Sequence, residues 1–168
     1  MIAIRREAPA DAGAVREVNT LAFGQPDEAT LVDRLRRRAE IYLGLVAVDD
    51  RAIVGHILFT PVPLHADENL VTLLALAPMA VRPGRQRQGI GSALVREGLA
   101  ACRAAGHDLV VVVGHPDFYP RFGFVRARRL GITSEPAFPD EAFMVAELAP
   151  GALGGRHGVI RYGPEFGV

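Results

Sequence analysis

The chain has 168 residues, 49% of them hydrophobic, and its 19 Lys and Arg residues balance its 19 Asp and Glu residues. This length and apolar content predict one domain, residues 1–168, with a substantial core. The balanced charge gives no indication of nucleic acid or an anionic membrane as a partner. Charge begins at Arg5, too early for a signal peptide, and the longest apolar stretch, 70–81, is far shorter than the roughly 20 residues that span a bilayer. We therefore expect a cytoplasmic protein.

The first half of the chain predicts an edge strand, two helices and an antiparallel meander of three strands. Asp11 is a candidate N-cap for the first helix, whose apolar face includes Leu21, and Gly24 begins the break before the second helix. Residues 49–51 form a tight turn between two apolar runs, which favours a β-hairpin. The expected elements are a strand over 3–6, helices over 12–23 and 28–38, and strands over 42–48, 52–61 and 70–81.

In the second half, a strand, a helix and a β-branched run follow one another, as in a βαβ unit. The two strands of such a unit run parallel, with a right-handed crossover. Cys102 is the only cysteine and lies beside alanines, so we expect a small core residue there. The expected elements are a helix over 89–105, a strand over 109–113, a short helix over 118–122, strands near 125 and over 142–148, a proline-broken loop over 132–140, and an extended tail over 149–168 outside a core of about 1–148.

Residues 81–92 have the features of an anion site at a helix N-terminus. Gly89 and Gly91 lack a β-carbon where the backbone enters the helix, so an anion can approach the free N–H groups of the first turn. Those amides carry the positive end of the helix dipole, which stabilises a nearby anion by roughly 0.3–1 kcal/mol. The loop has no Lys-Ser/Thr ending of a P-loop, and Leu94 stands where the dinucleotide fingerprint has its third glycine. A plain solvated turn has the same composition, so this stretch alone leaves both interpretations open.

Two motifs resemble the GCN5-related N-acetyltransferases (GNAT). Residues 86–91, Gln-x-x-Gly-x-Gly, resemble the acyl-CoA pyrophosphate loop of that family, and residues 119–124 resemble its Tyr-x-x-x-Gly-Phe element after the fifth strand. Residues 22–24 and 55–59 look like the YhbS-like branch. The resemblance extends over nearly the whole chain. It implies an α/β fold with a mixed, mostly antiparallel sheet, a central parallel βαβ unit and a V-shaped splay between strands 4 and 5.

The resemblance also implies a site for acetyl-CoA, as co-substrate, between the splayed strands 70–81 and 109–113. Backbone amides of the loop would hold the pyrophosphate, and the end of strand 4 would align the pantetheine arm like an added strand. By the family pattern, Tyr119 is the general acid that protonates the departing thiolate. The residues implied in cofactor binding are Met79, Ala80, Val81, Gln86, Arg87, Gln88, Gly89, Ile90, Gly91 and Ser92.

The general base is where this sequence departs from the family pattern. Many members carry a glutamate on the fourth strand, whereas 70–81 contains no carboxylate, and the usual asparagine before the tyrosine element is replaced by 114–117. His115 is therefore a candidate base, and His56 and Glu147 are weaker ones. Each has an alternative interpretation: His115 as part of a solvated turn, His56 as a hydrogen-bonded core residue, and Glu147 as a solvent-facing residue. No spacing of His, Cys and Asp predicts a metal site or a Ser-His-Asp triad.

We therefore expect an N-acetyltransferase that moves the acetyl group of acetyl-CoA to a primary amine by direct attack. The acceptor, a small molecule or a protein amine, is not indicated by the sequence, and the resemblance leaves a homodimer open. The lack of a clear base motivates one alternative, an acyl-CoA-binding sensor without turnover. A second alternative, a nucleotide-binding α/β module, is disfavoured because no loop lysine is followed by Ser or Thr.

Overall fold

The computed structural model describes residues 1–166, which divide into two compact units. Two long strands, β3 (Ala52–Ala66) and β4 (Asn69–Val81), contribute residues to both units. The prediction of one domain over the whole chain stays a prediction. Unit 1 comprises residues 1–60 and 77–101, and unit 2 comprises residues 61–76 and the chain from Cys102 onward.

Unit 1 contains an antiparallel arrangement in which β1 pairs with β2 and β2 pairs with β3. The hairpin between β2 and β3 turns at Asp50 and Arg51, whose φ values of 49° and 70° suit the type I′ turn that follows the twist of paired strands. This confirms the predicted hairpin. The other elements of unit 1 are β1 (Ile2–Arg6), α1 (Ala12–Phe23), α2 (Asp27–Arg38), β2 (Leu43–Asp49) and most of α3 (Ile90–Ala104).

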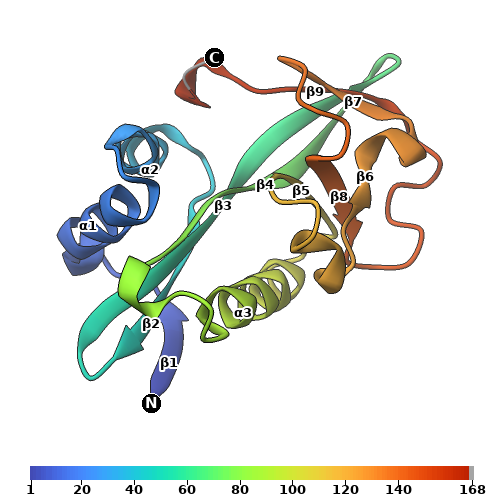
Figure 1. Cartoon of the computed structure of the whole chain (residues 1–168). Coiled ribbons are helices and arrows are strands. Elements are labelled where there is room, and N and C mark those ends of the chain that lie inside the picture. Colours follow the sequence, from blue (N-terminus) through green and yellow to red (C-terminus); the bar gives the residue numbers. More distant parts are fainter. Residues whose placement is uncertain (167–168) are drawn as a thin grey trace. The chain divides into compact units, whose positions relative to one another are not determined.

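Helices cover both faces of β3 within unit 1 (Figure 1). Asn19 of α1 contacts His56, whereas a Cβ built on Gly55 would lie 2.9 Å from Leu94 of α3. Because successive strand residues point to opposite faces, α1 and α3 lie on opposite sides of β3. Fully buried apolar side chains fill both interfaces: Val15, Val18, Val32, Leu35, Ile57, Leu58, Phe59 and Leu94.

Unit 2 contains the parallel strand pair. Residues 74–76 of β4 pair in parallel with residues 110–112 of β5 (Leu109–Val113), and β5 pairs with antiparallel β8 (Phe143–Glu147). This confirms the predicted parallel pair and the mixed, mostly antiparallel sheet. The remaining strands of unit 2 are β6 (Val125–Arg126), β7 (Ile132–Glu135) and β9 (Gly158–Arg161).

Two strand predictions are wrong, and both errors involve the C-terminal segment. β7 lies inside 132–140, where the prolines predicted a loop, and β3 continues to Ala66 instead of ending near Pro61. β9, from the predicted tail, pairs in parallel with β7 and antiparallel with residues 64–65 of β3. Partners this distant along the chain stabilise strands whose own sequences carry only a weak signal.

The start of α1 also differs from the prediction, although its bounds agree. Asp11 does not cap α1, because its carboxylate accepts the N–H of Ala8 at 2.7 Å and pairs with Arg5 at 2.7 Å. The pKa of Asp11 is lowered, first by the hydrogen bond from Arg5. Leu21, expected on the buried face, is 45% exposed, whereas Cys102 is buried as expected. Among residues 1–166, no helix has the length and apolar content needed to cross a membrane.

Candidate active site

The loop before α3 has an unusual backbone. After the 3₁₀ turn Pro83–Arg85, Arg87 and Gly89 both adopt left-handed conformations, with φ of 62° and 84°. The carbonyl of Gly89 then accepts the N–H of Ala93 at 3.0 Å, the first hydrogen bond of the α3 helix. The preceding amides, from Ile90 to Ser92, have no acceptor within the helix by its geometry. Left-handed residues next to free helix amides are the kind of backbone structure that can bind anions.

Side chains attach this loop to the ends of strands β4 and β2 in unit 1. Gln86 Nε2 donates to the carbonyl of Val81 at 3.0 Å, so its side chain closes the loop onto the end of β4. Arg85 Nη2 lies 2.7 Å from Asp49 Oδ2 on the β2–β3 hairpin, and Arg85 Nε donates to Gln88 at 3.3 Å. The hydrogen bond from Arg85, together with the N-terminal amine, lowers the pKa of Asp49. Within residues 86–92, the side chains of Gln86 and Gln88 are hydrogen-bonded to other protein groups, whereas the amides of the first helical turn have no acceptor within the helix.

The end of β4 is hydrogen-bonded to β3 along one edge. The N–H of Arg82, directly after β4, donates to Val54 of β3 at 2.9 Å, and the carbonyl of Ala80 lies beside Gly55 of β3. Peptide groups alternate in direction along a strand. The peptide groups of Met79 and Val81 therefore point away from β3. Of the three predicted residues, Met79 is half-buried, whereas Ala80 and Val81 are 2% and 8% exposed.

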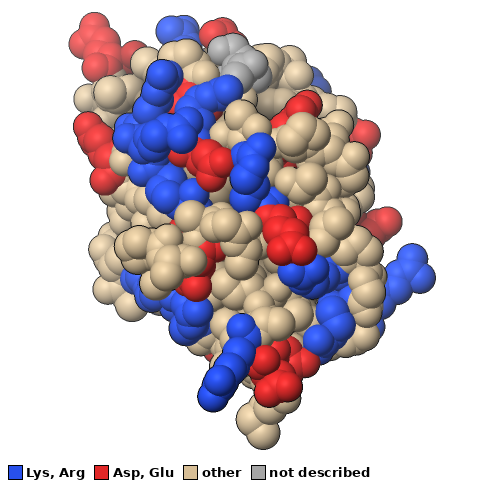
Figure 2. Space-filling view, turned by 90° about the vertical axis from the view of Figure 1, so that its left-hand side faces the viewer, with Lys and Arg blue, Asp and Glu red and all other residues tan. Residues whose placement is uncertain are grey.

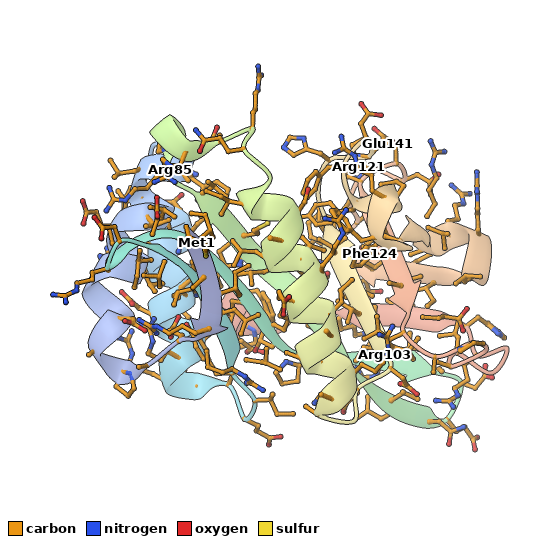
Figure 3. All side chains as sticks on the ribbon, turned by 90° about the horizontal axis from the view of Figure 1, so that it is seen from below. Met1, Arg85, Arg103, Arg121, Phe124 and Glu141 are labelled. Atoms are coloured by element: carbon orange, nitrogen blue, oxygen red, sulfur yellow. The ribbon has the colours of Figure 1, made fainter. Side chains whose placement is uncertain are left out.

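Tyr119 opens a 3₁₀ turn, Tyr119–Phe122, in unit 2 and lies in an aromatic cluster. Its ring packs edge to face with Phe118 at 5.0 Å and Phe124 at 5.6 Å between centroids, and only 6% of the residue is exposed. Figure 3 shows Phe124 beside β5. Burial raises the pKa of Tyr119 to about 12, so its hydroxyl keeps its proton at neutral pH.

His115 lies in the turn that leads from β5 to Tyr119. Its side chain is exposed, and its backbone carbonyl accepts the N–H of Phe118 at 3.1 Å and of Tyr119 at 3.4 Å. The two predicted catalytic residues are therefore joined through the backbone of one turn. Glu147, a weaker candidate base, accepts the N–H of Leu153 at 2.8 Å, which gives its carboxylate a structural role.

A buried polar network in unit 1 was not predicted. Glu7 Oε1 lies 2.8 Å from His56 Nε2, an ion-pair distance with poor hydrogen-bond angles, and accepts the hydroxyl of Tyr42 at 2.9 Å. Asn19 Nδ2 lies 3.2 Å from the other ring nitrogen of His56, which is fully buried. Arg36 Nη2 lies 3.3 Å from Glu7 Oε2. Since both ring nitrogens of His56 face protein groups, His56 is poorly placed to accept a proton from a substrate.

The charges in this network shift the pKa of Glu7. Burial alone would raise that pKa, but the contacts with His56 and Tyr42 and the charge of Arg36 outweigh burial and lower it. Burial and the neighbouring Glu7 raise the pKa of Tyr42. The only sequence signal for the network was a histidine in an apolar strand, because its members lie far apart along the chain.

The surface over α1 and α2 carries both signs of charge (Figure 2). Arg16 and Arg36 each pair with Asp33, at 2.6 and 2.8 Å. In the arginine-rich run 34–38, Arg37 and Arg38 are exposed, whereas Arg36 is half-buried. In the described part of the chain, no group of three His, Cys, Asp or Glu residues is arranged to hold a metal ion.

Comparisons with a protein-family model and with known sequences all identify acetyltransferases. A family model described as an acetyltransferase (GNAT) domain matches residues 3–127. The chain is 35% identical over 164 residues to the uncharacterized N-acetyltransferase YhbS of Escherichia coli K12, covering 97% of each chain. It is 41% identical over 116 residues to the uncharacterized N-acetyltransferase YjhQ of the same strain, covering 68% of this chain and 64% of YjhQ.

Two solved structures are similar over almost the full chain. The GNAT family N-acetyltransferase YhbS from Escherichia coli, in complex with CoA, matches with a TM-score of 0.89 and 34% identity over 99% of this chain and 92% of that one. A GNAT family acetyltransferase from Brucella melitensis, in complex with acetyl-CoA, matches with a TM-score of 0.80 and 33% identity over 99% and 98% of the two chains. These likenesses include both the loop before α3 and the Tyr119 turn.

Proposed function

This chain belongs to the GNAT family of acetyltransferases, and we propose that it transfers the acetyl group of acetyl-CoA to a primary amine by direct attack on the thioester. The observation that carries the proposal is the pair of left-handed residues, Arg87 and Gly89, at the N-terminus of α3. The complexes of the two similar proteins with CoA and acetyl-CoA support acetyl-CoA as the co-substrate.

In this proposal, the amides of residues 86–92 hold the pyrophosphate of acetyl-CoA. The free amides of the first helical turn and the helix dipole both favour an anion, and the exposed Arg87 adds a positive charge nearby. Gly89 leaves open space, because a Cβ built on it has no heavy atom within 4 Å. A phosphate group can therefore approach the backbone there without displacing protein atoms.

The free edge of β4 supports the pantetheine assignment. The N–H and carbonyl of Met79 and the N–H of Val81 point away from β3, so they can bond an extended amide-containing chain as another strand would, while the carbonyl of Val81 already accepts the side chain of Gln86. The predicted contact of Ala80 is then an apolar one, since its peptide group faces β3. A strand N–H at the thioester carbonyl would stabilise the oxyanion that forms when the amine attacks.

Tyr119 is proposed to donate a hydrogen bond to the departing sulfur. With a pKa of about 12, the tyrosine holds its proton more tightly than a thiol of pKa about 8.5. Complete proton transfer to the thiolate would therefore be uphill by roughly 5 kcal/mol. The hydroxyl thus acts first by stabilising the negative sulfur, and the pKa of Tyr119 must fall in the complex for it to act as a full general acid.

The attacking amine must lose a proton before it attacks. For an amine of pKa about 10.4, deprotonation at pH 7 requires roughly 4–5 kcal/mol, so a base is useful. His115 is the candidate, because its side chain is exposed in the turn that precedes Tyr119. The acceptor itself is proposed only as a primary amine, on a small molecule or a protein.

An acceptor screen tests this function. Purified protein is mixed with acetyl-CoA and a panel of primary amines, and the release of free thiol is measured together with acetyl-CoA binding by calorimetry. We expect binding without an amine and thiol release with a subset of amines. If the protein binds acetyl-CoA but releases no thiol with any of the amines tested, the result would support the acyl-CoA sensor instead. Competition by ATP as strong as that by CoA would support the nucleotide-binding module.

A further inference from the structure

We propose that Gly114, at the end of β5, is a positioning residue for Tyr119, and this inference rests on the function proposed above. A Cβ built on Gly114 would overlap Cε2 of the Tyr119 ring and lie 2.9 Å from Cδ2 and 3.4 Å from Cζ, the carbon that bears the hydroxyl. The ring therefore packs directly against the backbone of residue 114. Any side chain there would displace it.

The backbone conformation does not explain this glycine. Among the described residues, the glycines with positive φ include Gly123, which ends the Tyr119 turn, but not Gly114. Residues other than glycine can adopt the conformation of Gly114, so the requirement is for space. The space that the missing side chain leaves is taken by one edge of the Tyr119 ring.

The ring has little freedom to move away from a larger residue 114. Phe118 and Phe124 pack against Tyr119, and Phe124 is 2% exposed. The N–H of Gly114 donates to Ala142 at 2.9 Å, which attaches the end of β5 to the segment before β8. A methyl group at position 114 would therefore move the ring relative to the strand and shift its hydroxyl. A misplacement of about 1 Å at a reacting group lowers the rate by up to about 100-fold.

Kinetics of the Gly114→Ala variant test the proposal. We expect kcat to fall roughly 10- to 100-fold while the Kd for acetyl-CoA, measured by calorimetry, changes less than about threefold. In the Tyr119→Phe background, where the hydroxyl is already absent, Gly114→Ala should lower kcat no further. Gly13→Ala is the matched control, because a Cβ on Gly13 meets no heavy atom within 4 Å and its φ is not positive, and it should leave kcat unchanged.

The outcomes separate this proposal from the proposed function. If the wild-type protein turns over and Gly114→Ala has the same kcat, only the positioning role is overturned. The same conclusion follows if Gly114→Ala lowers kcat further in the Tyr119→Phe background. Absence of wild-type turnover with every amine overturns both. If Gly114→Ala folds poorly, adding Tyr119→Leu should raise its unfolding temperature, although Tyr119→Leu alone lowers it. Failure of that rescue overturns the predicted overlap with the ring.

Discussion

The loop before α3 and the Tyr119 turn obtain their geometry in different ways. In the loop, Arg87 and Gly89 adopt left-handed backbone conformations that expose amides, and most of the loop surface faces solvent. In the turn, one side chain is held by packing against Phe118, Phe124 and the backbone of Gly114. The first region is built from backbone torsions and the second from side-chain contacts.

This difference predicts which measurement each region affects. A substitution in the loop changes how donors face an anion, so it should change affinity for acetyl-CoA. A substitution in the turn changes where one hydroxyl lies, so it should change turnover. Four variants follow in order of decreasing expected effect: three test this division, and Glu7→Gln is a comparison outside both regions.

Gly89→Glu should have the largest effect. It places a non-glycine residue at a φ of 84°, which costs roughly 1–2 kcal/mol, and adds a carboxylate beside the proposed pyrophosphate. Repulsion of about 4 kcal/mol between close charges makes the expected loss of acetyl-CoA affinity roughly 1,000-fold or more. Calorimetry measures the affinity, and circular dichroism checks the fold. Gly89→Ala has the backbone strain without the charge and should lose less; unchanged binding in Gly89→Glu would contradict the pyrophosphate assignment.

Glu7→Gln tests whether stability and function are separable in unit 1. It removes the carboxylate that contacts His56, Tyr42 and Arg36, and breaking such a buried pair lowers the free energy of unfolding by about 3 kcal/mol at pH 7. Urea denaturation measures this loss, with the exposed Glu40→Gln as control. Acetyl-CoA affinity and kcat of the folded variant should stay at wild-type values. A changed affinity would show that the network also supports the loop.

The same variant has a predicted dependence on pH. The pKa of Glu7 is lowered by folding, so its contribution to stability is fully present above its ordinary value of 4.5 and is lost as the pH falls through the lower folded value. Wild-type stability should therefore fall below about pH 4.5 more steeply than that of Glu7→Gln. Parallel stability curves for the two proteins between pH 3 and 6 would disagree with the direction of this shift.

Tyr119→Phe should lower kcat by roughly 100-fold, because it removes the hydrogen-bond donor for the departing sulfur and keeps the aromatic packing. The Kd for acetyl-CoA should change less than about threefold, since affinity depends on the loop. Steady-state thiol release measures kcat, and calorimetry measures the Kd for acetyl-CoA. Equal kcat in the two proteins would remove Tyr119 from the reaction.

Arg85→Ala should have the smallest effect. The pair between Arg85 and Asp49 is partly exposed, with 32% and 23% of the two side chains accessible, and such pairs contribute about 0.2–1 kcal/mol. Acetyl-CoA affinity should therefore fall no more than a few-fold in a calorimetric titration. A loss as large as that of Gly89→Glu would show that side-chain contacts, and not backbone torsions, maintain the loop.

Several features followed from local sequence. The bounds of α1 and β5 agree with the periodic pattern of α1 and the uninterrupted β-branched run of β5. Gly89 was singled out because it lacks a β-carbon where the backbone enters the helix; that its φ is 84° is a finding of the structure. The family resemblance was visible in two short motifs, residues 86–91 and 119–124, because each motif is a continuous stretch of the chain.

Other features required partners that are distant along the chain. β7 forms where prolines predicted a loop, because β9 pairs with it, and Arg36 is half-buried because Glu7 and Tyr42 bond to it. The reason for a glycine at 114 is likewise visible only when the Tyr119 ring is seen against it. The sequence by itself determined the helices, most of the strands and the position of the glycine-bearing loop before a helix, since these depend on neighbours a few residues away. Only the tertiary structure decided the late strand pairings, the Glu7–His56 network and the packing of Tyr119, because long-range contacts leave no periodic signal in the chain.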